Sequence, residues 1–102
     1  MNNYLVAVSD EFTNMLNCNL SYLKVLSSSY VNSILLSISY YILLLEKFPF
    51  VFSRFFLPND DSLLLKITIA KRYYLIYQAT DNIVEILYFV DGRRSYDNMF
   101  TY

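Results

Sequence analysis

Two adjacent arginines near the C-terminal end of the chain are well suited to recognise another molecule. Arg93 and Arg94 follow the only glycine in the sequence, and a second basic pair, Lys71 and Arg72, lies earlier in the same region. The planar guanidinium of arginine binds carboxylates and phosphates through two parallel hydrogen bonds. We therefore expect the two basic pairs to contact a charged cellular target.

The charge balance supports a second interpretation of the same arginines. The formal net charge is −1, with 8 basic and 9 acidic residues, whereas proteins that bind nucleic acid through phosphates usually carry a basic surplus. Arg93 and Arg94 can instead pair with neighbouring acids and keep the end of a sheet solvated. A basic patch requires that folding separate the two signs of charge, and the sequence leaves both interpretations open.

Several classes of catalytic site are excluded by composition. The chain has no histidine, which removes the usual metal sites and histidine-based triads. Its single cysteine, Cys18, permits no internal disulfide and has no histidine to activate it, so we expect a small helix residue there. We expect no metal ion and no cofactor.

The residues between the two basic pairs predict a β-hairpin. Large side chains alternate along Tyr73 to Gln78 with the period of two typical of a strand. Thr80 to Asn82 supplies turn-forming residues, and Ile83 to Val90 is a second run rich in β-branched and aromatic residues. Gly92 follows, and we expect it to adopt a backbone conformation that other residues avoid.

The first half of the chain predicts a short strand and two helices. Tyr4 to Val8 is the strand, and Ser9 is placed to cap the first helix. Ser27 to Ser29 interrupts the helical pattern and can cap a second helix, from about Tyr30 to Lys47, whose apolar stripe is broad enough to need two neighbours. Because the connection is short, we expect an antiparallel helical hairpin. Apolar residues of the first helix recur at three- and four-residue steps: Phe12, Met15, Leu16, Leu20, Leu23 and Leu26.

The most apolar window, Ile34 to Leu45, predicts a buried helix rather than a membrane span. It covers 12 residues, whereas crossing a bilayer takes about 20. The N-terminus lacks the basic region and long apolar run of a signal peptide. We therefore expect a cytoplasmic protein without a membrane partner.

The segment that follows the second helix is rich in phenylalanine. Pro49 ends the helix, and the sequence FVFSRFFL after it gives no clear assignment. A small core cannot hide all of its aromatic side chains, and exposed apolar patches usually mark partner sites. The expected partner surface consists of Phe50, Phe52, Phe55 and Phe56.

These elements predict one α+β domain spanning residues 1–102. A further strand is expected from Leu63 to Ile69, so that the order is β-α-α-β-β-β. The helical hairpin should pack on one face of a small, mainly antiparallel sheet of about four strands. The residues expected to be buried are Ile34, Ile38, Tyr41, Leu45, Leu65, Ile67, Leu75 and Tyr77.

The order of elements and three short motifs resemble the RelE/ParE superfamily, the toxins of bacterial type II toxin–antitoxin systems. Leu45 to Pro49 resembles its L-x-x-F-P helix ending, and Arg72 to Gln78 resembles its R-Y-R-hydrophobic-hydrophobic-Y strand. Asp91 to Arg94 resembles its H-G-R-R turn. The resemblance covers almost the whole chain and implies a RelE/ParE-like toxin, held by a cognate antitoxin, that stops growth by attacking translation or DNA gyrase.

The Phe48-Pro49 signature and the turn from Asp91 to Arg94 favour the ParE-like branch, whose members inhibit gyrase without a catalytic constellation, and two departures argue against the RelE-like branch. RelE-like members cleave messenger RNA on the ribosome, and two of their functional positions correspond to Tyr74 and Phe100 here, in place of an arginine and a tyrosine. RNA cleavage needs a base for the 2′-hydroxyl and an acid for the leaving oxygen. If this chain is a nuclease, the residues to consider first are Arg94, Glu85 and Tyr96.

Three interpretations of function therefore remain. The favoured one is a ParE-like toxin that binds a target such as gyrase; the second is a RelE-like ribosome-dependent endoribonuclease; the third is an interaction module that kept the fold without toxicity. In the first two, an antitoxin segment should cover the phenylalanine-rich surface and the open face of the sheet, since extended or helical segments dock on grooves and strand edges.

Overall fold

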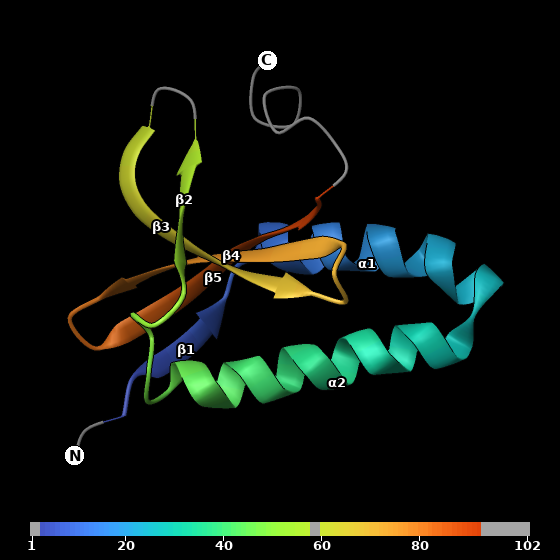
Figure 1. Ribbon diagram of the computed structural model, residues 1–102, viewed down its shortest axis with the longest axis horizontal. Helices are drawn as coiled ribbons and strands as arrows, with labels where there is room; N and C mark the ends of the chain where they lie inside the picture. Colours follow the sequence, from blue (N-terminus) through green and yellow to red (C-terminus); the bar gives the residue numbers. More distant parts are fainter. Residues whose placement is uncertain (1–2, 58–59, 93–102) are drawn as a thin grey trace.

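Two helices pack against a five-stranded mixed sheet in the computed structural model, which describes residues 3–57 and 60–92 (Figure 1). The strand order is β1-β5-β4-β3-β2, with β1 parallel to β5 and every other pair antiparallel. The predicted α+β class and helical hairpin are confirmed. The elements are β1 (Leu5–Val8), α1 (Asp10–Leu26), α2 (Ser28–Leu45), β2 (Ser53–Leu57), β3 (Asp60–Ile69), β4 (Tyr73–Thr80) and β5 (Ile83–Asp91).

Two serines define the helical hairpin. Ser9 is extended, with φ −74° and ψ 157°, and its side-chain oxygen accepts a hydrogen bond from the Phe12 amide at 3.0 Å. Ser27 ends α1 by donating its own amide to the Leu23 carbonyl, and its side chain caps α2 by accepting from the Tyr30 amide at 3.2 Å. The connection is thus a single residue, and the helices run in opposite directions as predicted (Figure 1).

The main core lies between the helices and one face of the sheet. It joins residues of both helices to alternate residues of β3, β4 and β5, among them Leu65, Leu75 and Phe89. All eight residues expected to be buried are so except Tyr41, which is half-buried. The period-two pattern therefore assigns the strand faces correctly.

A second, smaller cluster lies on the opposite side of the sheet. It consists of Phe55, Leu64, Ile76 and Val90. A β-bulge between β4 and β5 leaves Leu87 without a partner in the register, and the Ser9 hydroxyl donates to the Leu87 carbonyl at 2.8 Å. The face away from the helices is therefore partly apolar and packed, and β4 is buried on both sides.

The unassigned aromatic segment contains an additional strand, β2, so the predicted order is one strand short. β2 pairs with β3 through Ser53–Lys66, Arg54–Leu65 and Phe55–Leu64. Consecutive aromatic residues hide the alternation of this strand in the sequence. Only the pairing with β3 shows which side chains of β2 face inward. Phe55 is buried, whereas Phe56 is exposed, with Cζ of Arg54 4.6 Å from the centre of its ring.

The second helix is buried along one side only. Val31, Ile34, Ile38 and Leu45 face the core, and the outward side exposes large apolar residues: Leu35, Leu36, Tyr40 and Leu43. In the described part of the chain, α2 is the one helix that is long and apolar enough, by length and composition, to cross a membrane. The expectation of a buried core helix is therefore met only along one side, where four of the 18 residues of α2 are buried.

Candidate functional site

The turn between β3 and β4 carries the first predicted basic pair. Ala70 and Lys71 have positive φ angles of 55° and 59°, and the Arg72 amide donates to the Ile69 carbonyl at 3.1 Å. Residues other than glycine rarely adopt this left-handed conformation. The tight turn leaves Lys71 exposed at the end of the sheet, where its ammonium is accessible to a partner.

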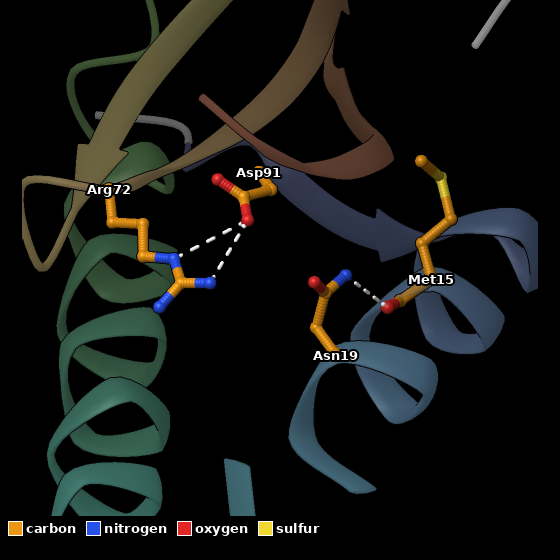
Figure 2. Close-up of polar contacts among 4 residues, drawn as sticks. All are labelled: Met15, Asn19, Arg72 and Asp91. Carbon is orange, nitrogen blue, oxygen red and sulfur yellow. Dashed lines mark hydrogen bonds and ion pairs between the residues drawn. The ribbon is translucent and has the colours of Figure 1, made fainter. Parts of the chain in front are cut away.

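Arg72 does not project freely from this turn. Its Nη2 lies 3.1 Å and its Nε 3.4 Å from Oδ2 of Asp91, whose side chain is 7% exposed (Figure 2). The hydrogen bond to Asp91 raises the pKa of Arg72, and the guanidinium also lies 5.0 Å from the centre of the Tyr73 ring. Arg72 therefore holds the end of β5 against the β3–β4 turn, which the sequence did not indicate.

Gly92 is required for a close backbone approach, not for a positive φ as expected. No glycine in the described chain has a positive φ. Its amide donates to the Arg72 carbonyl at 2.6 Å, and an added Cβ would lie 2.7 Å from that same oxygen. Any side chain would thus collide with a backbone atom, which explains the glycine on steric grounds.

The other basic pair and two of the fallback catalytic residues lie outside the described residues. These are Arg93, Arg94 and Tyr96, together with Phe100. The described chain ends at Gly92, beside the turn that carries Lys71. The predicted target-binding surface is therefore placed only in part, by Lys71 and Arg72.

Two residues of the nuclease alternative, Tyr74 and Glu85, lie on the sheet face away from the helices, together with Lys66. The Lys66 ammonium lies 4.6 Å from the centre of the Tyr74 ring, a distance typical of a cation–π contact. Glu85 is half-buried in β5, and its Oε1 accepts a hydrogen bond from Nε2 of Gln78 at 3.1 Å. The fold thus places Lys66 beside Tyr74, whereas Glu85 is hydrogen-bonded to Gln78, its partner on the adjacent strand.

The four phenylalanines of the predicted partner surface do not share one face. Phe50 and Phe56 are 55% and 69% exposed. Phe52 packs edge-on against Tyr41 and Tyr77 with ring centres 5.9 and 6.5 Å apart, and Phe55 is buried in the second cluster. Only Phe50 and Phe56 remain broadly accessible, because the register of β2 turns Phe55 inward.

A buried contact ties the helix-ending motif to the central strand. The Tyr77 hydroxyl donates to the Pro49 carbonyl at 2.7 Å, across 28 residues of sequence. Burial raises the pKa of Tyr77 above its ordinary value. Tyr77 therefore positions the segment that follows α2, a role that its alternation in the strand does not reveal.

A cavity of about 290 Å³, which no sequence pattern predicted, opens at the edge of the sheet. Its lining residues are Tyr41, Val51, Phe52, Ser53, Lys66, Ile67 and Thr68. They come from α2, from the segment before β2, from the first residue of β2 and from β3. No sequence signal located it, because β2 had no assignment in the sequence, and the lengths of five residues for β2 and ten for β3 are known only from the fold.

Comparisons with known proteins do not extend this description. A scan against protein-family models gives no match, and a search of curated proteins gives no match either. Within residues 3–57 and 60–92, no group of three or more histidine, cysteine, aspartate or glutamate side chains could hold a metal ion. Functional inference for this chain rests on its residues, its fold and the contacts described above.

Proposed function

We propose that the protein is the toxin of a type II toxin–antitoxin system, of the ParE-like kind, and that it stops growth by binding a target such as DNA gyrase. One observation carries this proposal. The three motifs of the RelE/ParE resemblance, far apart in the sequence, meet in the fold: Tyr77 bonds to Pro49, and Arg72 pairs with Asp91. Each motif supplies a residue that holds another in place, as expected of a pattern that specifies one architecture.

The anchored end of β5 suggests how target binding works. The Gly92 amide donates to the Arg72 carbonyl, so the residue that precedes Arg93 and Arg94 in the sequence is hydrogen-bonded beside the exposed Lys71. Cations that start from a fixed backbone lose less conformational entropy on binding than cations on a free tail. Since Arg72 is paired with Asp91, its part is to hold this turn, and the contact with the target falls to the other three cations.

The proposed toxin acts in the cytoplasm and is neutralised by a cognate antitoxin. Phe50 and Phe56 are exposed and belong to the segment in which sequence reasoning placed the antitoxin surface. Burying exposed aromatic side chains is a large part of the binding energy at many protein interfaces. They are the accessible portion of that surface.

A RelE-like endoribonuclease is the second candidate. It is favoured by the juxtaposition of Lys66 and Tyr74, a cation and a tyrosine on the sheet face away from the helices. Such a pair can hold an RNA backbone and stack on a base. Cleavage further requires an acid and a base, for which Arg94, Glu85 and Tyr96 are the proposed residues; Glu85 is the described member and already bonds to Gln78.

The test is controlled expression without an antitoxin, with growth, translation and DNA supercoiling followed in parallel. The double variant Arg93→Ala/Arg94→Ala should restore growth, and we expect the purified variant to melt within a few degrees of the unmodified protein, because ion pairs of arginine side chains typically add no more than about 1 kcal/mol unless they are buried. The matched control removes two exposed cations elsewhere, Lys24 and Lys47, and should remain toxic.

Each readout separates the candidates. Loss of supercoiling activity with intact messenger RNA supports the ParE-like function. Cleaved messenger RNA with normal supercoiling supports the endoribonuclease. Normal growth on expression of the unmodified, folded protein contradicts both and leaves the non-toxic interaction module.

A further inference from the structure

The cavity at the sheet edge coincides with a missing stretch of strand pairing. The register of β2 against β3 ends at Ser53–Lys66, whereas β3 continues to Ile69 and pairs with β4 over its whole C-terminal half. No described strand lies beside Ile67, Thr68 and Ile69 on the side away from β4. Successive residues of a strand direct their backbone groups to opposite edges, so at least one of these three presents its N–H and C=O to the open side.

The residues that line this gap lie on both faces of the sheet. Tyr41 and Phe52 belong to the main core and border the gap on the helix side. Lys66 and Thr68 alternate with the buried Ile67 and therefore project from the opposite face. A strand inserted here would place successive side chains alternately against an aromatic wall and against a polar, positively charged one.

The positive charge in the lining of the gap favours an added strand that carries acidic residues. Lys66 is the single charged residue in the cavity lining, and its ammonium is held 4.6 Å from the centre of the Tyr74 ring. Because Lys66 lines the open edge, its positive charge is complementary to a carboxylate on an added strand. The cavity, at about 290 Å³, is at the lower limit of small-molecule pockets, which suits a few residues of peptide better than a cofactor.

We propose that the gap beside Ile67–Ile69 binds an extended peptide segment in which apolar and acidic residues alternate, so that the peptide adds a strand to β3 in line with β2. Main-chain hydrogen bonds to β3 supply affinity, the aromatic wall accepts the apolar side chain and Lys66 binds the carboxylate. The assignment of this segment to the antitoxin rests on the proposed function; the peptide chemistry follows from the groove itself.

The first experiment uses three synthetic peptides and the full-length protein. One heptapeptide alternates valine and glutamate, the second replaces glutamate by lysine, and the third is the first with alternate backbone amides methylated. The glutamate peptide should bind at least about tenfold more tightly than the lysine peptide, and methylation should abolish binding because it blocks strand pairing. Amide chemical shifts should change at residues 51–53 and 66–69.

Charge reversal at one position makes the test specific. Lys66→Glu should invert the preference, so that the lysine peptide binds more tightly than the glutamate peptide. Lys66→Met, which keeps the length and apolar stem of the side chain, should reduce the preference to about twofold. The matched control Lys24→Glu changes the net charge equally on the exposed surface of α1 and should leave the preference unchanged.

Several results would overturn the proposal. They are no saturable binding of the glutamate peptide, equal binding of the methylated peptide, shifts centred on the outward side of α2, and a gap occupied by a second copy of the chain in solution. Toxicity is an independent readout: Arg93→Ala/Arg94→Ala should keep peptide binding. If that variant loses toxicity and the unmodified protein binds no peptide, the groove proposal fails while the proposed function stands.

Discussion

Two aromatic-rich regions of this protein have largely opposite environments. In the β4–β5 hairpin, Tyr73, Tyr77 and Phe89 are at most 1% exposed. In the segment from 48 to 56, Phe48, Phe50 and Phe56 are all more than half exposed. Phe89 is buried in one region and Phe50 is exposed in the other, so residue type alone does not decide burial.

Position in the sheet is what separates the two regions. β4 and β5 each have a neighbouring strand on both sides, and both faces of β4 are covered by clusters that include Leu75 on one side and Ile76 on the other. β2 is an edge strand with one neighbour. The hairpin therefore carries the stability of the fold, and the edge segment offers the surface that a partner can use.

Truncating one phenylalanine in each region gives the largest expected contrast. Phe89 packs edge-on against Phe12 and stacks on Tyr73 with ring centres 5.9 and 5.0 Å apart. Phe89→Ala should lower the free energy of unfolding by about 3–5 kcal/mol, and Phe50→Ala by less than about 1 kcal/mol. Urea titrations followed by circular dichroism measure both. Similar losses for the two variants would show that the edge segment is also part of the cooperative core.

The pairing of Arg72 with Asp91 tests whether polar contacts also concentrate in the hairpin. Asp91→Ala should cost about 2 kcal/mol, less than the loss expected for a fully buried pair, because 26% of the Arg72 side chain is exposed. A double-mutant cycle with Arg72→Ala should give a coupling of about 1 kcal/mol. The matched cycle on Gln78 and Glu85 should give less than about 0.5 kcal/mol, since both are partly exposed.

The hydrogen bond from Tyr77 to Pro49 joins the two regions, and its removal should have a smaller, pH-dependent effect. At neutral pH, Tyr77→Phe should cost about 1–2 kcal/mol, because the buried carbonyl of Pro49 loses its donor. Burial raises the pKa of Tyr77, so above the ordinary value of 10.0 the unfolded chain loses this proton before the folded chain does. The stability of the unmodified protein should then fall with rising pH.

The variant lacks this ionisation, so the stability difference between the two proteins should shrink above pH 10 by up to about 1.4 kcal/mol per pH unit. Chemical unfolding at several pH values between about 8 and 11 measures the difference. Parallel curves over this range would contradict the burial of the Tyr77 hydroxyl. Titration of the other tyrosines is common to both proteins and cancels in the comparison.

The smallest expected effect is a gain in stability at the turn before β4. Ala70 has a φ of 55°, a conformation that costs about 1 kcal/mol for a residue with a Cβ. Ala70→Gly should therefore stabilise the protein by about 0.5 kcal/mol after the entropy of the unfolded chain is included. The matched change Ala79→Gly, in β4 at a φ that is not positive, should destabilise it. Thermal melting distinguishes the two signs.

The amino-acid sequence by itself determined the elements whose signals are local. The capping serines, the three- and four-residue spacing along the helices and the alternation in 73–90 depend on neighbours a few residues away. They predicted both helices, the central hairpin and most of the core. They also identified Lys71 as a surface cation.

Only the tertiary structure decided the features that depend on contacts between distant segments. It turned Phe55 inward and Phe56 outward through the register of β2, and it paired Arg72 with Asp91 across 19 residues. It gave Gly92 a steric role beside the Arg72 carbonyl and opened the groove where β3 outlasts β2. These contacts depend on the register between strands and on which distant segments lie side by side. Neither property produces a pattern among residues that are close in the sequence.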